Sequence, residues 1–89
     1  MIEQSITIVN KLGLHARAAA KFVTTASAFT STIQVARNGR IVNGKSIMGL
    51  MMLAAAKDTN IIIHIDGEDE QQAYDAIENL INDFFGEGE

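Results

Sequence analysis

Apolar residues alternate with polar ones in several segments of the chain, a pattern typical of β-strands with one buried face. Within residues 60–66, Ile61, Ile63 and Ile65 fall on one face of an extended strand, which predicts that this face is buried. Weaker alternation predicts three more strands, over residues 2–9, 32–37 and 40–43. Asn38-Gly39 is a strong signal for a two-residue hairpin between the strands at 32–37 and 40–43.

Two helices are expected between these strands. The alanine-rich segment from Ala16 to about Ser27 has high helix propensity and predicts the first helix. Ser46 is a candidate N-cap for a short second helix, which runs from Ile47 to about Leu53 or Ala54.

A third helix is expected near the end of the chain, up to Gly86. Asp69 and Gln72 form a pair that resembles a capping box at its start. Its apolar stripe contains Ala73, Ile77, Leu80, Ile81 and Phe84. The last three residues, 87–89, are expected to fray.

The expected order is therefore strand, helix, strand, strand, helix, strand, helix (βαββαβα). Short connections and strands with one apolar face imply one antiparallel sheet with the helices on one side, which is an α+β fold. The 89 residues are enough for one domain, spanning 1–89, with a modest core but without a deep substrate cavity.

Composition excludes several kinds of site. The chain has no cysteine, so a disulfide framework, a thiol nucleophile and a cysteine-based metal site are excluded. His64 is expected to be structural or solvent-facing, and the two histidines lack the paired carboxylates of a metal site. We expect no metal and no other cofactor. Neither a membrane-spanning apolar run nor a signal-peptide pattern is present, so we expect a cytoplasmic protein without direct membrane insertion.

The charges are unevenly distributed along the chain. All seven Lys and Arg residues lie between Lys11 and Lys57, where there is no Asp or Glu, and ten of the eleven acidic residues lie from Asp58 onward. The net charge of −4 and the lack of aromatic interleaving in the basic stretch argue against nucleic acid as a partner. A basic surface around His15 would hold phosphate and steer an acidic protein partner, unless folding mixes the two halves.

The segment before the first helix is the most informative for function. Gly13 allows a turn, and His15 is expected at or beside the cap of the helix that starts at Ala16. At that position the free N–H groups and the helix dipole favour an anion and a neutral, nucleophilic imidazole. Arg17 offers a donor fork for phosphate oxygens. We therefore expect that His15 can accept a phosphoryl group; if His15 is inert, the chain would be a small binding or allosteric domain.

Three motifs occur in sequence: Gly13-Leu14-His15-Ala16-Arg17, Gly44-Lys45-Ser46-Ile47-Met48-Gly49 and Gly67-Glu68-Asp69-Glu70-Gln71. In this order and spacing they resemble the histidine-containing phosphocarrier (HPr) family of the bacterial phosphoenolpyruvate-dependent sugar phosphotransferase system. The resemblance covers essentially the whole chain. It implies an open-faced β-sandwich in which a four-stranded antiparallel sheet has the spatial order 1-4-2-3 and three helices cover one face.

The resemblance also implies the chemistry. In HPr, the histidine that matches His15 accepts a phosphoryl group on Nδ1 from phospho-enzyme I and donates it to enzyme IIA proteins, and Arg17 matches the arginine beside it. Such a protein is a phosphoryl relay, not an enzyme, and is most simply a monomer. One departure is Ala18, which stands where many members have proline at an early helical position, and which leaves the local geometry open.

Regulation and docking are implied as well. Ser46 matches a serine that HPr kinase/phosphorylase modifies in some members, where the added charge would repel an acidic partner; on local sequence alone it is a simple N-cap. Ile47, Met48 and Met51 match an exposed apolar patch that docks partners. The nearest alternative is the nitrogen-related (NPr-type) phosphocarrier, which uses the same histidine for regulation in place of sugar uptake.

Overall fold

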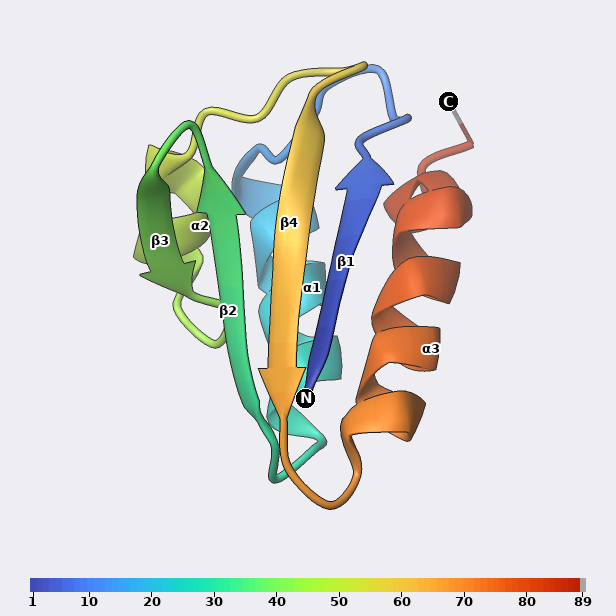
Figure 1. Cartoon of the computed structure of the whole chain (residues 1–89). Coiled ribbons are helices and arrows are strands. Elements are labelled where there is room, and N and C mark those ends of the chain that lie inside the picture. The colour runs from blue at the N-terminus through green and yellow to red at the C-terminus, as the bar shows by residue number, and fades with distance from the viewer. Residues whose placement is uncertain (89) are drawn as a thin grey trace.

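The computed structural model describes residues 1–88; Glu89, in the segment predicted to fray, lies outside the described residues. Within residues 1–88 the strands and helices follow the predicted order (Figure 1). They are β1 (Ile2–Thr7), α1 (Ala16–Ser27), β2 (Thr32–Arg37), β3 (Arg40–Asn43), α2 (Ile47–Met52), β4 (Asn60–Asp66), α3 (Glu70–Asn82) and the 3₁₀ turn η1 (Phe84–Gly86).

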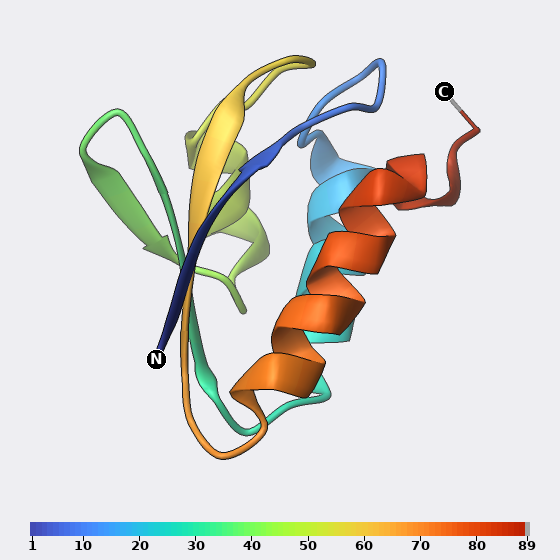
Figure 2. The ribbon, with the colours of Figure 1, turned by 45° about the vertical axis from the view of Figure 1, so that its right-hand side comes forward.

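The four strands form one antiparallel sheet in the order β1-β4-β2-β3. This is the order that the resemblance implied, and it confirms the α+β open-faced sandwich. Ile63 in β4 pairs with Gln4 in β1 and with Val35 in β2, so β4 lies between these two strands. Figure 2 shows the sheet from its side, with the helices on one face and the opposite face uncovered.

The core lies between the sheet and the helices. As predicted, Ile61, Ile63 and Ile65 of β4 are fully buried. They belong to one cluster of buried residues that joins the inner face of the sheet to all three helices. Phe22 of α1 and Leu50 of α2 are also fully buried in this cluster, so the short second helix is anchored to the same core.

Asp69 is the N-cap residue of α3, but the predicted capping-box contact is wrong. The side chain of Asp69 makes no cap hydrogen bond to α3. Its carboxylate accepts hydrogen bonds from the backbone N–H groups of Thr30 and Ser31, at 2.9 and 3.0 Å, and also from the Ser31 hydroxyl. Asp69 therefore joins the loop between α1 and β2 to the start of α3. The bonded residues are 38 or 39 positions apart in the chain, so local sequence cannot indicate this contact.

The predicted apolar stripe of the third helix is also wrong at its end. Phe84 is 37% exposed, whereas Phe85 is fully buried. The reason is that α3 ends at Asn82 and that both phenylalanines take positive φ angles, of 57° and 53°. This reversal of the chain turns Phe85, in place of Phe84, into the core and directs the following residues back toward the start of α1.

Candidate functional site

The turn before α1 is held against the loop that precedes β4. The Leu14 N–H donates to the Ala55 carbonyl oxygen at 2.9 Å. Gly13 has a φ of +67°, and a Cβ at this position would lie 2.9 Å from the Ala56 Cα atom. Because both the backbone angle and the close approach exclude a side chain, glycine is required here. This turn sets the position of the next functional residue, His15.

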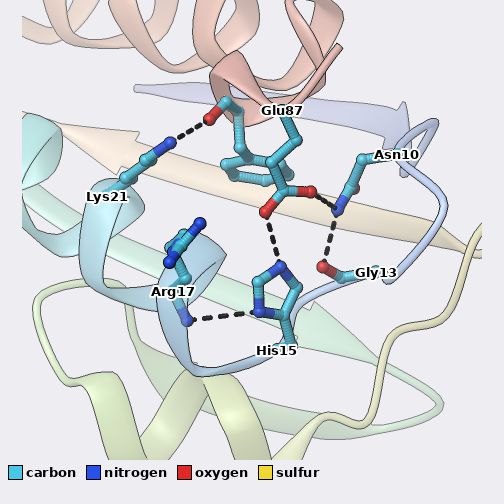
Figure 3. Close-up of polar contacts among 7 residues, drawn as sticks. Asn10, Gly13, His15, Arg17, Lys21 and Glu87 are labelled. Atoms are coloured by element: carbon cyan, nitrogen blue, oxygen red, sulfur yellow. Dashed lines mark hydrogen bonds and ion pairs between the residues drawn. The ribbon is translucent and has the colours of Figure 1, made fainter. Parts of the chain in front are cut away.

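His15 is the N-cap residue of α1, as predicted. Its Nδ1 atom accepts a hydrogen bond from the Arg17 N–H at 3.3 Å (Figure 3). Its carbonyl oxygen accepts one from the Ala19 N–H at 2.8 Å. An atom that accepts a hydrogen bond carries a lone pair, so the lone pair of the neutral ring faces the first turn of α1. The side chain is 29% exposed, which leaves the ring open to solvent.

The opposite side of the ring contacts the end of the chain. The His15 Nε2 atom lies 2.5 Å from a carboxylate oxygen of Glu87, whose side chain is only 13% exposed. The other carboxylate oxygen of Glu87 accepts a hydrogen bond from the Asn10 amide at 3.1 Å. Burial raises the pKa of the Glu87 carboxyl, but hydrogen bonds from His15 and Asn10 together with nearby positive charge lower it by more. Glu87 is therefore held as a carboxylate against the ring.

A surface pocket of about 630 Å³ surrounds this ring. Its lining residues are Lys11, Leu12, His15, Ala16, Arg17, Lys21, Gly86 and Glu87. The Lys21 ammonium also donates to the Phe85 carbonyl oxygen at 2.6 Å. The basic half of the chain thus supplies three cations around His15, and the acidic half supplies one carboxylate. Folding mixes the two halves at this point, but the cations still make the pocket suitable for a phosphoryl group.

Ser46 and the exposed residues of α2 lie where the sequence placed them. Ser46 is the N-cap of α2, and its hydroxyl oxygen accepts a hydrogen bond from the Gly49 N–H at 3.0 Å. Ile47, Met48 and Met51 are 40%, 71% and 42% exposed. Since α2 also packs against α1, an exposed apolar surface lies on a helix that contacts the helix capped by His15.

The second histidine is unrelated to this site. His64 lies on the uncovered face of β4, where its Nδ1 atom is 3.4 Å from a carboxylate oxygen of Glu3 on the neighbouring strand. This agrees with a structural or solvent-facing role. Among residues 1–88, no three His, Cys, Asp or Glu side chains are grouped so that they could hold a metal ion. Nor does any helix in the described part of the chain have the length and apolar character to cross a membrane.

Four residues of the site were missed from sequence: Asn10, Lys11, Lys21 and Glu87. Lys21 follows Arg17 by four residues in a predicted helix, and that spacing was a usable signal because such residues share a helix face. Asn10 and Glu87 gave no such signal. Glu87 was expected to fray, and its contact with His15 depends on the reversal of the chain after α3.

Known proteins share this architecture and this sequence. The family described as "PTS HPr component phosphorylation site" matches residues 2–83. The phosphocarrier protein HPr of Neisseria meningitidis is 62% identical over 89 residues, which cover 100% of both chains. The crystal structure of HPr-C-His from Thermoanaerobacter tengcongensis has a TM-score of 0.94 at 47% identity, over 98% of both chains. An HPr dimer from the same organism has a TM-score of 0.79 at 47% identity, over 98% of this chain and 100% of that chain. The chain therefore belongs to the HPr family of phosphocarrier proteins of the phosphotransferase system.

Proposed function

We propose that residues 1–89 act as one phosphocarrier domain in which Nδ1 of His15 accepts a phosphoryl group from phospho-enzyme I and donates it to enzyme IIA proteins. The observation that carries this proposal is the position of the Nδ1 lone pair. It faces the first turn of α1, on a ring that is 29% exposed and surrounded by Lys11, Arg17 and Lys21.

The transfer needs only atoms that lie at this surface. The Nδ1 lone pair attacks phosphorus, an Nδ1–P bond forms, and the bond between phosphorus and the donor's leaving atom breaks, with the electron pair remaining on that atom. The free N–H groups of the first turn then face the transferred dianion, and the Arg17 guanidinium can donate to its oxygens. Donation to enzyme IIA is the same step in reverse, so the site must stabilise the group only moderately.

This mode of action is that of a relay and not of an enzyme. The pocket at His15 lies at the surface, and two different proteins must reach the same ring atom in turn. A small cytoplasmic monomer that presents one face to each partner satisfies this requirement. An elution volume in size-exclusion chromatography that corresponds to a dimer would contradict the monomeric state.

Ser46 and the exposed residues of α2 are proposed to modulate the encounter. Modification of Ser46 by HPr kinase/phosphorylase would add a dianion at the N-terminus of α2, where the helix dipole tolerates it but an acidic partner does not. Ile47, Met48 and Met51 are proposed to dock partners, since methionine adapts to several surfaces. Met48→Glu should weaken enzyme I binding without a lower thermal midpoint; unchanged affinity would exclude Met48 from the interface.

The direct test is incubation with enzyme I, Mg²⁺ and phosphoenolpyruvate, followed by intact-mass analysis of wild type, His15→Ala and the matched control His64→Ala. We expect one added phosphate that is acid-labile and base-stable in the wild type and in His64→Ala, and none in His15→Ala. Addition of enzyme IIA should then remove it. Labelling that persists in His15→Ala would refute the assignment.

A further inference from the structure

We propose that Glu87 and Asn10 are positioning residues for phosphoryl transfer: the Glu87 carboxylate holds the ring proton of His15 on Nε2, and Asn10 holds the carboxylate. This inference rests on the proposed function of His15 as the acceptor, and it adds the groups that prepare the ring. It assigns a function to the end of the chain, which the motifs of the sequence do not include.

The hydrogen bonds of the ring define which nitrogen is the nucleophile. Nδ1 accepts from the Arg17 N–H, so the proton of the neutral ring is on Nε2, where it is donated to Glu87 at 2.5 Å. A carboxylate at this position stabilises that arrangement of proton and lone pair and fixes the plane of the ring. The lone pair is thereby kept on Nδ1, beside the first turn of α1 (Figure 3).

The same contact acts on the phosphorylated ring. When Nδ1 is bonded to phosphorus and Nε2 keeps its proton, the ring carries a positive charge. The Glu87 carboxylate stabilises this charge, as the carboxylate of a catalytic triad stabilises imidazolium. On donation, Nδ1 keeps the electron pair of the broken N–P bond, and the ring returns to its neutral form with the proton still on Nε2. Glu87 thus favours transfer in both directions.

Asn10 holds Glu87 through a buried amide. Asn10 is fully buried, and its amide group donates to the Glu87 carboxylate at 3.1 Å and to the Gly13 carbonyl oxygen at 2.8 Å. Among the described residues, its own carbonyl oxygen has no hydrogen-bond partner. A buried acceptor without a partner is unfavourable, so this orientation is maintained by the two acceptors that the amide reaches. Asn10 therefore links the turn at Gly13 to the Glu87 carboxylate, which in turn contacts the His15 ring.

The backbone just before Glu87 has a strained conformation. Phe84 and Phe85 both lie in the left-handed region, which costs energy for residues other than glycine. The burial of Phe85 and the hydrogen bond from Lys21 to its carbonyl oxygen hold this conformation. Strained backbone of this kind is concentrated at functional sites, and here its effect is to place Glu87 against His15.

The test measures both the rate and its pH dependence in the full chain. Glu87→Gln keeps the shape of the side chain but removes its charge. The matched control is Asp83→Asn, which removes one charge from the same segment; the Asp83 side chain makes no cap hydrogen bond that this change would break. We expect Glu87→Gln to accept the phosphoryl group from phospho-enzyme I about tenfold more slowly, the equivalent of one charge-assisted hydrogen bond. Asp83→Asn should match the wild type.

The pH profile separates a role at the ring from a structural role. The protonated phospho-ring loses its phosphoryl group faster than the neutral one, so hydrolysis slows as pH rises through the loss of that proton. In Glu87→Gln the midpoint of this profile should move to lower pH by about one unit, and Glu87→Asp should lie between it and the wild type. Identical profiles in Glu87→Gln and Asp83→Asn would overturn the proposal.

Asn10 is tested by a double-mutant cycle. If Asn10 acts through Glu87, Asn10→Ala should slow transfer in the wild type and have a much smaller effect in the Glu87→Gln background. Fully additive effects would show that Asn10 only supports the glycine turn. If His15→Ala loses the label but Glu87→Gln keeps the wild-type rates and pH profile, this inference is refuted. The proposed function of His15 would then still stand.

Discussion

The Nε2 atom of His15 and a carboxylate oxygen of Glu87 lie 2.5 Å apart, although 72 positions separate the two residues in the chain. The acceptor turn and the end of the chain therefore form one structural unit. His15 is placed from one side by Gly13 and the start of α1, and from the other by the segment that follows α3. Changes in either part are expected to affect transfer even where the sheet is intact.

The glycine turn gives the first prediction. Gly13→Ala should lower the free energy of unfolding by more than about 1 kcal/mol, because alanine is strained at positive φ and its Cβ would meet the Ala56 backbone. Acceptance from phospho-enzyme I should slow in parallel. The measurements are urea denaturation and the rate of phosphorylation.

Gly39→Ala is the matched control for this substitution. Gly39 also has a positive φ, of 80°, but nothing lies within 4 Å of a Cβ placed there. It should share the cost of backbone strain without the cost of close approach, and its phosphorylation rate should equal that of the wild type. Equal losses of stability in the two variants would contradict the role of packing at Gly13.

The second prediction concerns Arg17. Arg17→Glu should slow phosphoryl acceptance by roughly 10- to 100-fold, since it places a like charge beside the transferred dianion. Arg17→Lys keeps the charge but loses the planar fork, so its rate should be intermediate. Lys57→Glu makes the same change of charge outside the pocket and serves as the control. If Arg17→Glu and Lys57→Glu are equally slow, only the net charge matters.

Ser46 gives the third prediction. Ser46→Ala removes the hydroxyl that accepts from the Gly49 N–H and should cost about 0.5–2 kcal/mol of stability. Ser46→Asp keeps a capping side chain, so its stability should stay near that of the wild type, while its affinity for enzyme I should fall roughly tenfold. Ser46→Asn, which caps without a charge, separates the two effects. Equal affinity for Ser46→Asp and Ser46→Asn would leave Ser46 as a helix cap alone.

The pH dependence of stability gives the fourth prediction. The hydrogen bond from the Ser31 hydroxyl, followed by that from the Thr30 N–H, lowers the pKa of Asp69 to about 2 from its ordinary 3.8. A lowered pKa stabilises the fold above the unfolded value, so this contribution should be complete above about pH 4 and lost as the pH falls toward 2. Denaturation midpoints between pH 2 and about pH 5 should therefore show this component in the wild type.

Two variants isolate the contribution of Asp69. Asp69→Asn should be less stable at neutral pH and should lose less stability as the pH falls. Glu68→Gln removes the neighbouring exposed charge and should keep the steep dependence of the wild type. A wild-type slope in Asp69→Asn would show that the loop contact contributes nothing to acid sensitivity.

Features that depend on neighbouring residues were predictable from the sequence, whereas contacts between distant segments were not. Strand β4 and the cap positions of His15 and Ser46 were predictable, because alternation, helix propensity and capping are properties of neighbouring residues. The contacts of Asp69 and Glu87 were not, because each joins segments far apart in the chain. The positive φ angles at Phe84 and Phe85 could not be predicted either, since such angles are typical of glycine and asparagine and not of phenylalanine.

Nuclear magnetic resonance can show directly whether Nδ1 of His15 carries the phosphoryl group. Protein labelled with ¹⁵N-histidine would be phosphorylated by enzyme I and phosphoenolpyruvate, and the ³¹P–¹⁵N coupling would identify the bonded nitrogen. We expect a coupling to Nδ1 of His15, with the proton on Nε2 and the signals of His64 unchanged. A coupling to Nε2, or phosphorus on a residue other than His15, would contradict the assignment of Nδ1 as the acceptor atom.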